Sequence, residues 1–73
     1  MEISAIKLLI EQGLEGSTAV VTGDGRHFEV SVSCTDFEGK SLLQRQRMVM
    51  ATVKTQIESD ELHALSIKTQ VSS

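Results

Sequence analysis

The sequence contains no proline, tryptophan or tyrosine, only two phenylalanines and a single cysteine. With so few aromatic side chains, the chain has little with which to stack nucleic-acid bases. Its one thiol, Cys34, cannot form an internal disulfide, which favours a reducing setting. No apolar run approaches the roughly 20 residues that cross a bilayer, and the acidic start at residues 1–4 is unlike a basic secretory signal. We therefore expect a cytoplasmic protein with no membrane segment.

The 73 residues are enough for one domain, 1–73, with no room for a second core. A chain of this size buries only about 60% of the surface that its unfolded form exposes, so we expect no deep substrate pocket. The sequence also lacks a Ser/His/Asp set, a zinc-protease helix motif and a phosphate-binding loop. These absences favour a binding module over an enzyme. We expect the protein to be a monomer or a weak homodimer when it is alone.

Charge is distributed unevenly along the chain. The net charge of −3 argues against a protein built mainly to coat nucleic acid. Residues 38–58 nevertheless hold four basic side chains against two acidic ones, a local charge of +2. The four basic residues are Lys40, Arg45, Arg47 and Lys54. A local basic face on an acidic body is typical of a surface that docks a partner.

The first half of the chain predicts a helix followed by a hairpin. Apolar residues recur at helical spacing over 3–12, and Gly13 stands where a C-cap glycine is expected. A β-branched run at 17–22 and an alternating run at 28–33 predict two antiparallel strands, joined by an Asp-Gly turn signal. Cys34 shares the parity of the inward residues of the second run, so we expect a buried, inert thiol.

The second half predicts one longer helix. Ser41 with Gln44 forms the sequence pattern of a capping box. From there we expect the helix to reach about Ile57, with Gln46 largely buried in the middle of its apolar stripe and Met48 on the opposite side. The residues of the stripe are Leu42, Val49, Met50, Val53 and Ile57.

A last strand completes the predicted fold. Residues 62–69 predict a strand with His63, Leu65 and Ile67 on one face, and we expect residues 70–73 to be frayed. A helix separates this strand from the hairpin, which allows parallel pairing with a right-handed crossover. The order helix, strand, strand, helix, strand therefore predicts an α+β fold with a three-stranded mixed sheet and both helices packed on one face.

Three stretches of the sequence resemble the BolA-like family. Residues 37–49 (FEGKSLLQRQRMV) fill every fixed position of its signature, F-x-G-x-x-x-x-x-R-x-R-x-V. Residues 62–69 (LHALSIKT) resemble the family's closing strand, and residues 23–28 (GDGRHF) resemble the hairpin of its IbaG-like branch. The resemblance implies a class II KH-like fold. It also implies a non-enzymatic role in iron–sulfur cluster trafficking or iron regulation, in complex with a monothiol glutaredoxin and glutathione.

The same resemblance implies which residues bind metal. The histidine of the closing strand is a ligand of a [2Fe–2S] cluster in such complexes, and here it is His63. A second ligand comes from the hairpin loop, where His27 is the only candidate because the loop has no cysteine. Two histidines cannot complete an iron–sulfur site, so the remaining ligands would come from the partner, and the chain alone would hold no cluster. Gln46 stands where much of the family has histidine, and the chain ends at Ser73, where relatives continue with a proline- and tryptophan-containing tail.

Other interpretations stay open at this point. By spacing alone, His63 could be a hydrogen-bonded strand residue and His27 a solvated turn residue. The basic residues of the second helix could meet phosphate, glutathione or an acidic partner, or could lie over the core and pair with carboxylates. The alternative function is a transcription regulator that binds DNA through the second helix. BolA-like proteins have also been regarded as transcription regulators, and the resemblance further implies a link to stress responses.

Overall fold

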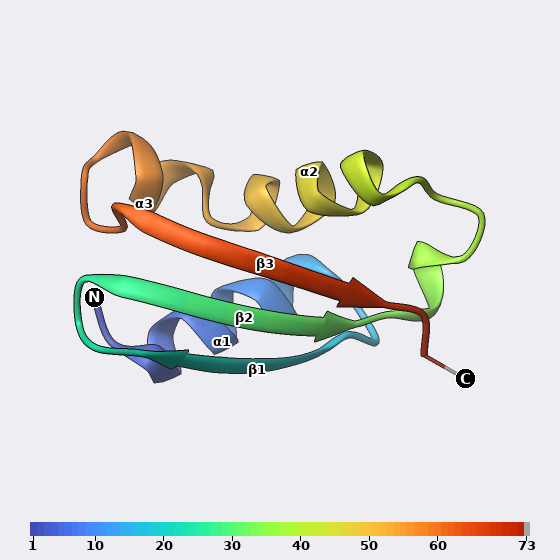
Figure 1. Cartoon of the computed structure of the whole chain (residues 1–73), viewed down its shortest axis with the longest axis horizontal. Helices are drawn as coiled ribbons and strands as arrows, with labels where there is room; N and C mark the ends of the chain where they lie inside the picture. The colour runs from blue at the N-terminus through green and yellow to red at the C-terminus, as the bar shows by residue number, and fades with distance from the viewer. Residues whose placement is uncertain (73) are drawn as a thin grey trace.

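A computed structural model describes residues 1–72 of the protein and places all its strands in one sheet (Figure 1). The elements are α1 (Ile3–Gly13), β1 (Thr18–Gly23), β2 (His27–Ser33), a 3-10 turn η1 (Thr35–Phe37), α2 (Leu42–Thr52), α3 (Lys54–Glu58) and β3 (Ala64–Gln70). Among the described residues, no helix has the length and apolar character needed to cross a membrane.

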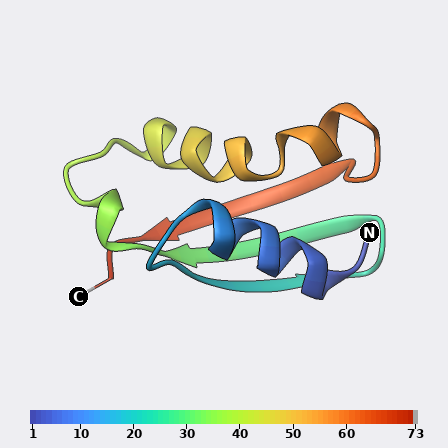
Figure 2. The same ribbon diagram turned by 180° about the vertical axis from the view of Figure 1, so that it is seen from behind.

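The sheet is mixed, with β2 at its centre. β1 pairs antiparallel with β2, and β3 pairs parallel with its other side. The helices lie together on one face of the sheet, which the view from behind shows most clearly (Figure 2). The predicted α+β fold, including the parallel closing strand, is therefore confirmed, and it is compatible with the class II KH-like arrangement.

The core lies between the sheet and the helices. Along β2, buried and exposed residues alternate, as the sequence predicted. Cys34 continues this alternation and is fully buried, which confirms its inward position. The buried apolar residues are Ile6, Ile10, Ala19, Val21, Phe28, Val30, Val32, Cys34, Phe37, Val49, Val53 and Leu62.

The second helix is interrupted, whereas the sequence predicted a continuous helix to Ile57. Val53 has φ −120° and ψ 17°, so α2 ends at Thr52 and α3 begins at Lys54. The N–H of Val53 donates to the carbonyl of Met50, three residues back, and the Thr52 hydroxyl donates to the carbonyl of Val49 at 2.6 Å. Neighbouring β-branched residues and a hydroxyl that bonds the backbone both weaken helix continuation.

The buried side of α2 is also rotated from the predicted stripe. Ser41 and Gln44 do form the predicted capping box. Leu42, however, is 62% exposed and Met50 is 37% exposed, although both belong to the predicted stripe. Met48, predicted on the opposite side, packs against the core, and Gln46 is half-buried rather than largely buried. The buried side is set by where α2 meets α1 and the sheet, which the sequence period alone does not define.

The closing strand begins later and ends later than predicted. It spans Ala64–Gln70 instead of 62–69, so Leu62 and His63 precede the strand. Gln70 was expected to be frayed, but its carbonyl accepts the N–H of Cys34, and the N–H of Ser72 donates to the carbonyl of Cys34. Both contacts extend the pairing with β2. The prediction for Ser73 lies outside the described residues.

Gly13 has a different role from the predicted helix cap. It is the last residue of α1, and Leu14 is the C-cap. A Cβ atom at Gly13 would lie 2.6 Å from Cγ2 of Thr52. The absence of a side chain at Gly13 therefore allows α1 to approach α2 closely.

We expect Gly13→Ala to destabilise the fold. Overpacking a close contact costs about 1–3 kcal/mol, which exceeds the gain of up to about 1 kcal/mol in helix propensity from glycine to alanine. Thr52→Ser removes Cγ2 and keeps the hydroxyl, so the double variant should recover part of the loss. Chemical denaturation followed by circular dichroism measures both. A Gly13→Ala variant more stable than the wild type would contradict this account.

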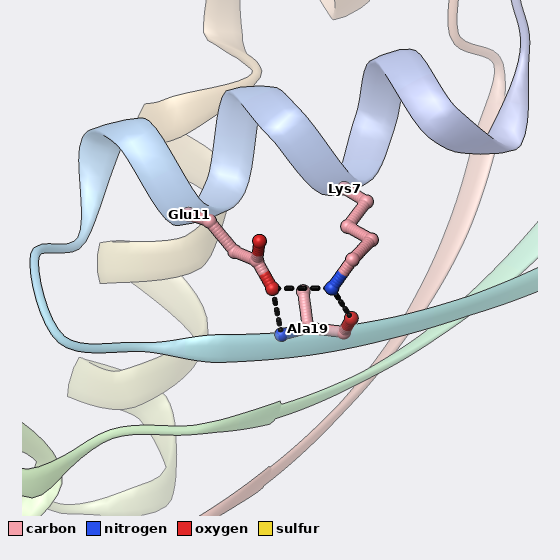
Figure 3. A network of polar contacts seen from close by, with 3 residues as sticks. All are labelled: Lys7, Glu11 and Ala19. Atoms are coloured by element: carbon pink, nitrogen blue, oxygen red, sulfur yellow. Dashed lines mark hydrogen bonds and ion pairs between the residues drawn. The ribbon is translucent and has the colours of Figure 1, made fainter.

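Side chains of α1 hold the outer edge of β1 (Figure 3). The carboxylate of Glu11 accepts the N–H of Ala19 at 2.9 Å, and the ammonium of Lys7 donates to the carbonyl of Ala19 at 2.9 Å. Lys7 and Glu11 also form an ion pair with each other. The pKa of Glu11 lies below its ordinary value of 4.5. The main cause is the hydrogen bond from the N–H of Ala19, and the second is the hydrogen bond from Lys7.

This lowered pKa predicts a pH dependence of stability. A carboxylate with a lowered pKa in the folded state stabilises the fold above its unfolded pKa, and the contribution is lost as the pH falls through the folded value. We therefore expect the thermal midpoint of the wild type to drop below about pH 4.5. Glu11→Gln should be less stable at pH 7 and lose less on acidification, whereas Glu15→Gln, on the exposed link after α1, should behave like the wild type. Parallel curves for the wild type and Glu11→Gln would contradict the assignment.

Candidate metal and partner site at the hairpin end of the sheet

The two histidines meet at one end of the sheet. The parallel register pairs His27, the first residue of β2, with Ala64, the first residue of β3, so His63 lies diagonally next to His27. Both imidazoles line an open pocket of about 430 Å³. The other lining residues are Met1, Gly25, Arg26 and Glu61. The two candidate ligands are thus brought together from positions 36 residues apart in the sequence.

The hairpin turn that carries His27 is built around Asp24. One carboxylate oxygen of Asp24 accepts the N–H of Arg26 at 2.9 Å and the N–H of His27 at 2.8 Å. These two bonds hold the pKa of Asp24 below its usual value, and the bond from the N–H of His27 has the larger effect. Gly25 adopts a φ of +97°, which a side chain would disfavour. The other oxygen of Asp24 lies 3.9 Å from Nδ1 of His27, whose side chain is 75% exposed.

The segment before β3 fixes the position of His63. Leu62 is buried, and its N–H donates to the carbonyl of Gln56 at 3.1 Å. On the other side of His63, Ala64 enters the ladder with β2. His63 lies between these two anchored residues and its side chain is exposed, although its sequence parity is that of the half-buried Leu65 and Ile67. Its position ahead of the strand leaves it accessible at the end of the sheet.

Chemically, the pocket offers two nitrogen ligands. Among residues 1–72 there is no group of three or more His, Cys, Asp or Glu side chains that could hold a metal ion. A structural metal site normally needs about four protein ligands. Two neighbouring histidines do fit one iron of a [2Fe–2S] cluster, because in Rieske centres two histidines replace two cysteines on one iron. The arrangement fits half of a shared site.

The basic residues in and around the second helix differ in their contacts. Nε of Arg45 donates to the carbonyl of Lys40 at 3.0 Å, and its guanidinium lies 6.0 Å from the ring centre of Phe37. Arg45 is half-buried, and its side chain has a structural contact. The partner is the carbonyl of Lys40 and not the carboxylate that the sequence suggested. Lys54 lies 3.8 Å from Glu58 in an exposed pair. Lys40 and Arg47 are exposed.

Sequence reasoning did not identify three of the residues around the histidines. Arg26 directly precedes His27, and Glu61 lies two residues before His63, but only the folded register shows that they share a pocket. Met1 has no sequence signal, since α1 begins at Ile3 and its direction brings the N-terminus to this end of the sheet (Figure 1). The position of Asp24 was signalled by the Asp-Gly turn, although its hydrogen bonds were not.

Comparison with known proteins decides the family. Residues 7–73 match the family model described as BolA-like protein. The chain belongs to the BolA-like family. It is 52% identical over 46 residues to Protein BOLA2 of Arabidopsis thaliana, a match that covers 63% of this chain and 47%, or about half, of that protein. It is 32% identical over 68 residues to the Acid stress protein IbaG of Escherichia coli K12, which covers 93% of this chain and 81% of the relative.

Solved structures of BolA-like proteins share the fold. The structure of a bolA protein homologue from Coxiella burnetii superposes with a TM-score of 0.85 at 43% sequence identity. The superposition covers 94% of this chain and 88% of that structure. The mixed sheet and its helical layer are therefore those of this family.

The turn geometry predicts a difference between two substitutions of Asp24. Asp24→Asn keeps a side-chain oxygen that can accept the N–H groups of Arg26 and His27, whereas Asp24→Ala removes it. We expect faster hydrogen exchange at these two amides in Asp24→Ala and near wild-type exchange in Asp24→Asn, measured by NMR. Unchanged exchange in Asp24→Ala would show that the carboxylate does not hold the turn.

Proposed function

We propose that the protein is a non-enzymatic adaptor that binds a monothiol glutaredoxin with glutathione and shares the coordination of a [2Fe–2S] cluster. The observation that carries this proposal is the pair of exposed imidazoles, His27 and His63, in one pocket at the end of the sheet. Membership of the BolA-like family supports it, because the family resemblance implies such a partnership.

The accessibility and number of the ligands both fit a shared site. Both side chains are exposed, so a second protein can approach them without unfolding this one. Each imidazole must be neutral to coordinate, and each offers one nitrogen. Thiolates from the partner would complete the site, since the one thiol of this chain, Cys34, is fully buried. In this arrangement the chain alone holds no cluster.

The cellular setting is part of the same proposal. We place the protein in the cytoplasm, where reducing conditions keep thiols available for cluster ligation. One relative carries the name Acid stress protein, which supports a role in a stress response. Such a role would be served by moving or sensing iron–sulfur clusters.

The nucleic-acid alternative gains no support from the positions of the side chains. Its expected basic face loses Arg45 to the contact with the Lys40 carbonyl. Phe28 and Phe37 are the only Phe, Tyr or Trp residues in the sequence, and both are buried, so neither can stack on a base. The shared-cluster function is the better supported of the two.

A titration with cluster-loaded glutaredoxin tests the proposal. We expect the wild type to change the visible absorption and circular dichroism of the cluster, because imidazole ligands replace ligands of the glutaredoxin form. His63→Ala and His27→Ala should each abolish the new spectrum. Ser66→Ala, an exposed change on β3, is the matched control and should give the wild-type spectrum.

The outcome is informative only if the variants are folded. Far-ultraviolet circular dichroism and thermal melting of each variant check this. If both histidine variants gave the wild-type spectrum, this pocket would not ligate the cluster. If the wild type left the spectrum unchanged, the partnership itself would be wrong.

A further inference from the structure

The two edges of the sheet differ in how their backbone groups are satisfied. On the β1 edge, Glu11 and Lys7 bond both the N–H and the carbonyl of Ala19 (Figure 3). An edge strand whose polar groups are taken up in this way is protected against pairing with another chain. At Ala19, therefore, the β1 edge is closed by the protein itself.

On the β3 edge, the corresponding backbone groups have no partner within the described part of the chain. The Cys34 backbone bonds the carbonyl of Gln70 and the N–H of Ser72, so the even-numbered residues of this segment turn toward β2. Backbone direction alternates along a parallel strand, so Leu65, Ile67 and Thr69 turn theirs outward. Within residues 1–72, no hydrogen bond reaches the N–H or carbonyl groups of these three residues.

A helix flank overhangs this free edge. In both views α2 lies beyond β3, on the side away from β2 (Figures 1 and 2). Thr52 of α2 faces Gly13 of α1. At about 100° per residue, Met50 lies about 160° round the helix from Thr52, on the flank turned away from α1. Met50 is 37% exposed. An open cavity of about 280 Å³ on this flank is lined by Met50, Ala51, Lys54, Ile57 and Glu58.

We propose that the free edge of β3 and the overhanging flank of α2 and α3 form a slot that binds an extended, acidic peptide segment of a partner protein as a fourth strand. The outward backbone groups of Leu65, Ile67 and Thr69 pair with the peptide backbone, as in other cases of strand addition. Apolar peptide side chains on the helix side contact Met50 and Ile57. This proposal goes beyond the shared cluster and does not depend on it.

Charge selects an acidic peptide. Lys54 lies in the cavity wall, and Arg47 is about 60° round the helix from Met50. Lys68 is exposed on β3 itself. The ion pair of Lys54 with Glu58 is exposed at 3.8 Å, and such pairs contribute little, so an incoming carboxylate can replace it. Lys54 and Arg47 thus lie on the helix side of the slot, and Lys68 lies on the opposite face of the sheet.

The same charges argue against a second copy in the slot. Pairing of β3 with β3 of another copy would bring Arg47 and Lys54 of both copies to the same side of the sheet, where they repel. A nucleic acid fits less well, because both phenylalanines are buried and the slot offers a row of strand-spaced backbone groups. The peptide satisfies both the hydrogen bonds and the charge.

Amide hydrogen exchange with a synthetic peptide tests the slot. The probe is an end-capped octapeptide of alternating valine and glutamate in which one helix-side valine is replaced by glutamate, so that carboxylates face both Lys54 and Lys68. It is added to the full chain without glutaredoxin. We expect slower exchange at the amides of Leu65, Ile67 and Thr69. A peptide with one valine N-methylated at a pairing position should bind about tenfold more weakly, because it loses one hydrogen bond. A peptide with lysine in place of glutamate should show no protection.

Variants separate the slot from the rest of the surface. Met50→Glu places a carboxylate beside the peptide and should weaken binding at least tenfold. Leu8→Glu, at a position 56% exposed on α1, is the matched control and should bind as the wild type does. His63→Ala should also bind the peptide normally, so failure of the cluster proposal and failure of the slot are distinguishable.

Four outcomes would overturn the proposal. The first is no protection of the three amides at millimolar peptide. The second is equal protection by the lysine peptide, which would remove the argument from charge. The third is protection without peptide that grows with protein concentration, which would identify a second copy as the occupant. The fourth is that a DNA duplex, and not the peptide, protects the three amides, and that this protection is lost when salt is added.

Discussion

The structure depends on one strand, β2, which hydrogen-bonds to both other strands. Its alternating residues supply a row of buried side chains, Phe28, Val30 and Val32, in the same core as the buried residues of α1 and α2. Because strand side chains alternate with a period of two, a slip of one residue would turn this row to solvent. The register of the whole sheet is therefore fixed by burial, and the site residues at its end inherit their positions from that register.

The parts of the fold that could be predicted from sequence are those set by local pattern. Alternation over 28–33, the Asp-Gly turn and the capping box at Ser41 all gave the right element in the right place. The break at Val53 could not be predicted, because helical periodicity continues across it and only local hydrogen bonds to the Met50 and Val49 carbonyls reveal it. The buried side of α2 likewise depends on the approach to α1 at Gly13, a contact between distant segments.

The candidate site was only partly visible in the sequence. His27 and His63 were identified by family resemblance, whereas spacing alone left both as ordinary turn and strand residues. Their neighbourhood follows from the parallel pairing of His27 with Ala64. The exposure of His63 contradicts its strand parity, because the strand begins at Ala64, two residues later than the pattern predicted. The role of Arg45 could not be predicted either, since its partner is the Lys40 carbonyl rather than a carboxylate.

The pocket lies at the start of β3, and the proposed slot runs along the free edge of the same strand. His63 immediately precedes β3, and the outward backbone groups of Leu65, Ile67 and Thr69 follow it along the free edge. A partner segment paired with this edge would therefore have one end beside the imidazoles. Metal sharing through two exposed ligands gives little orientation by itself, because the ligands restrain only one point of the partner. Backbone pairing along β3 restrains the partner segment over its whole length, and the hydrogen bonds fix the direction and register of that segment. The two features together would hold a partner in a single orientation that neither could impose alone.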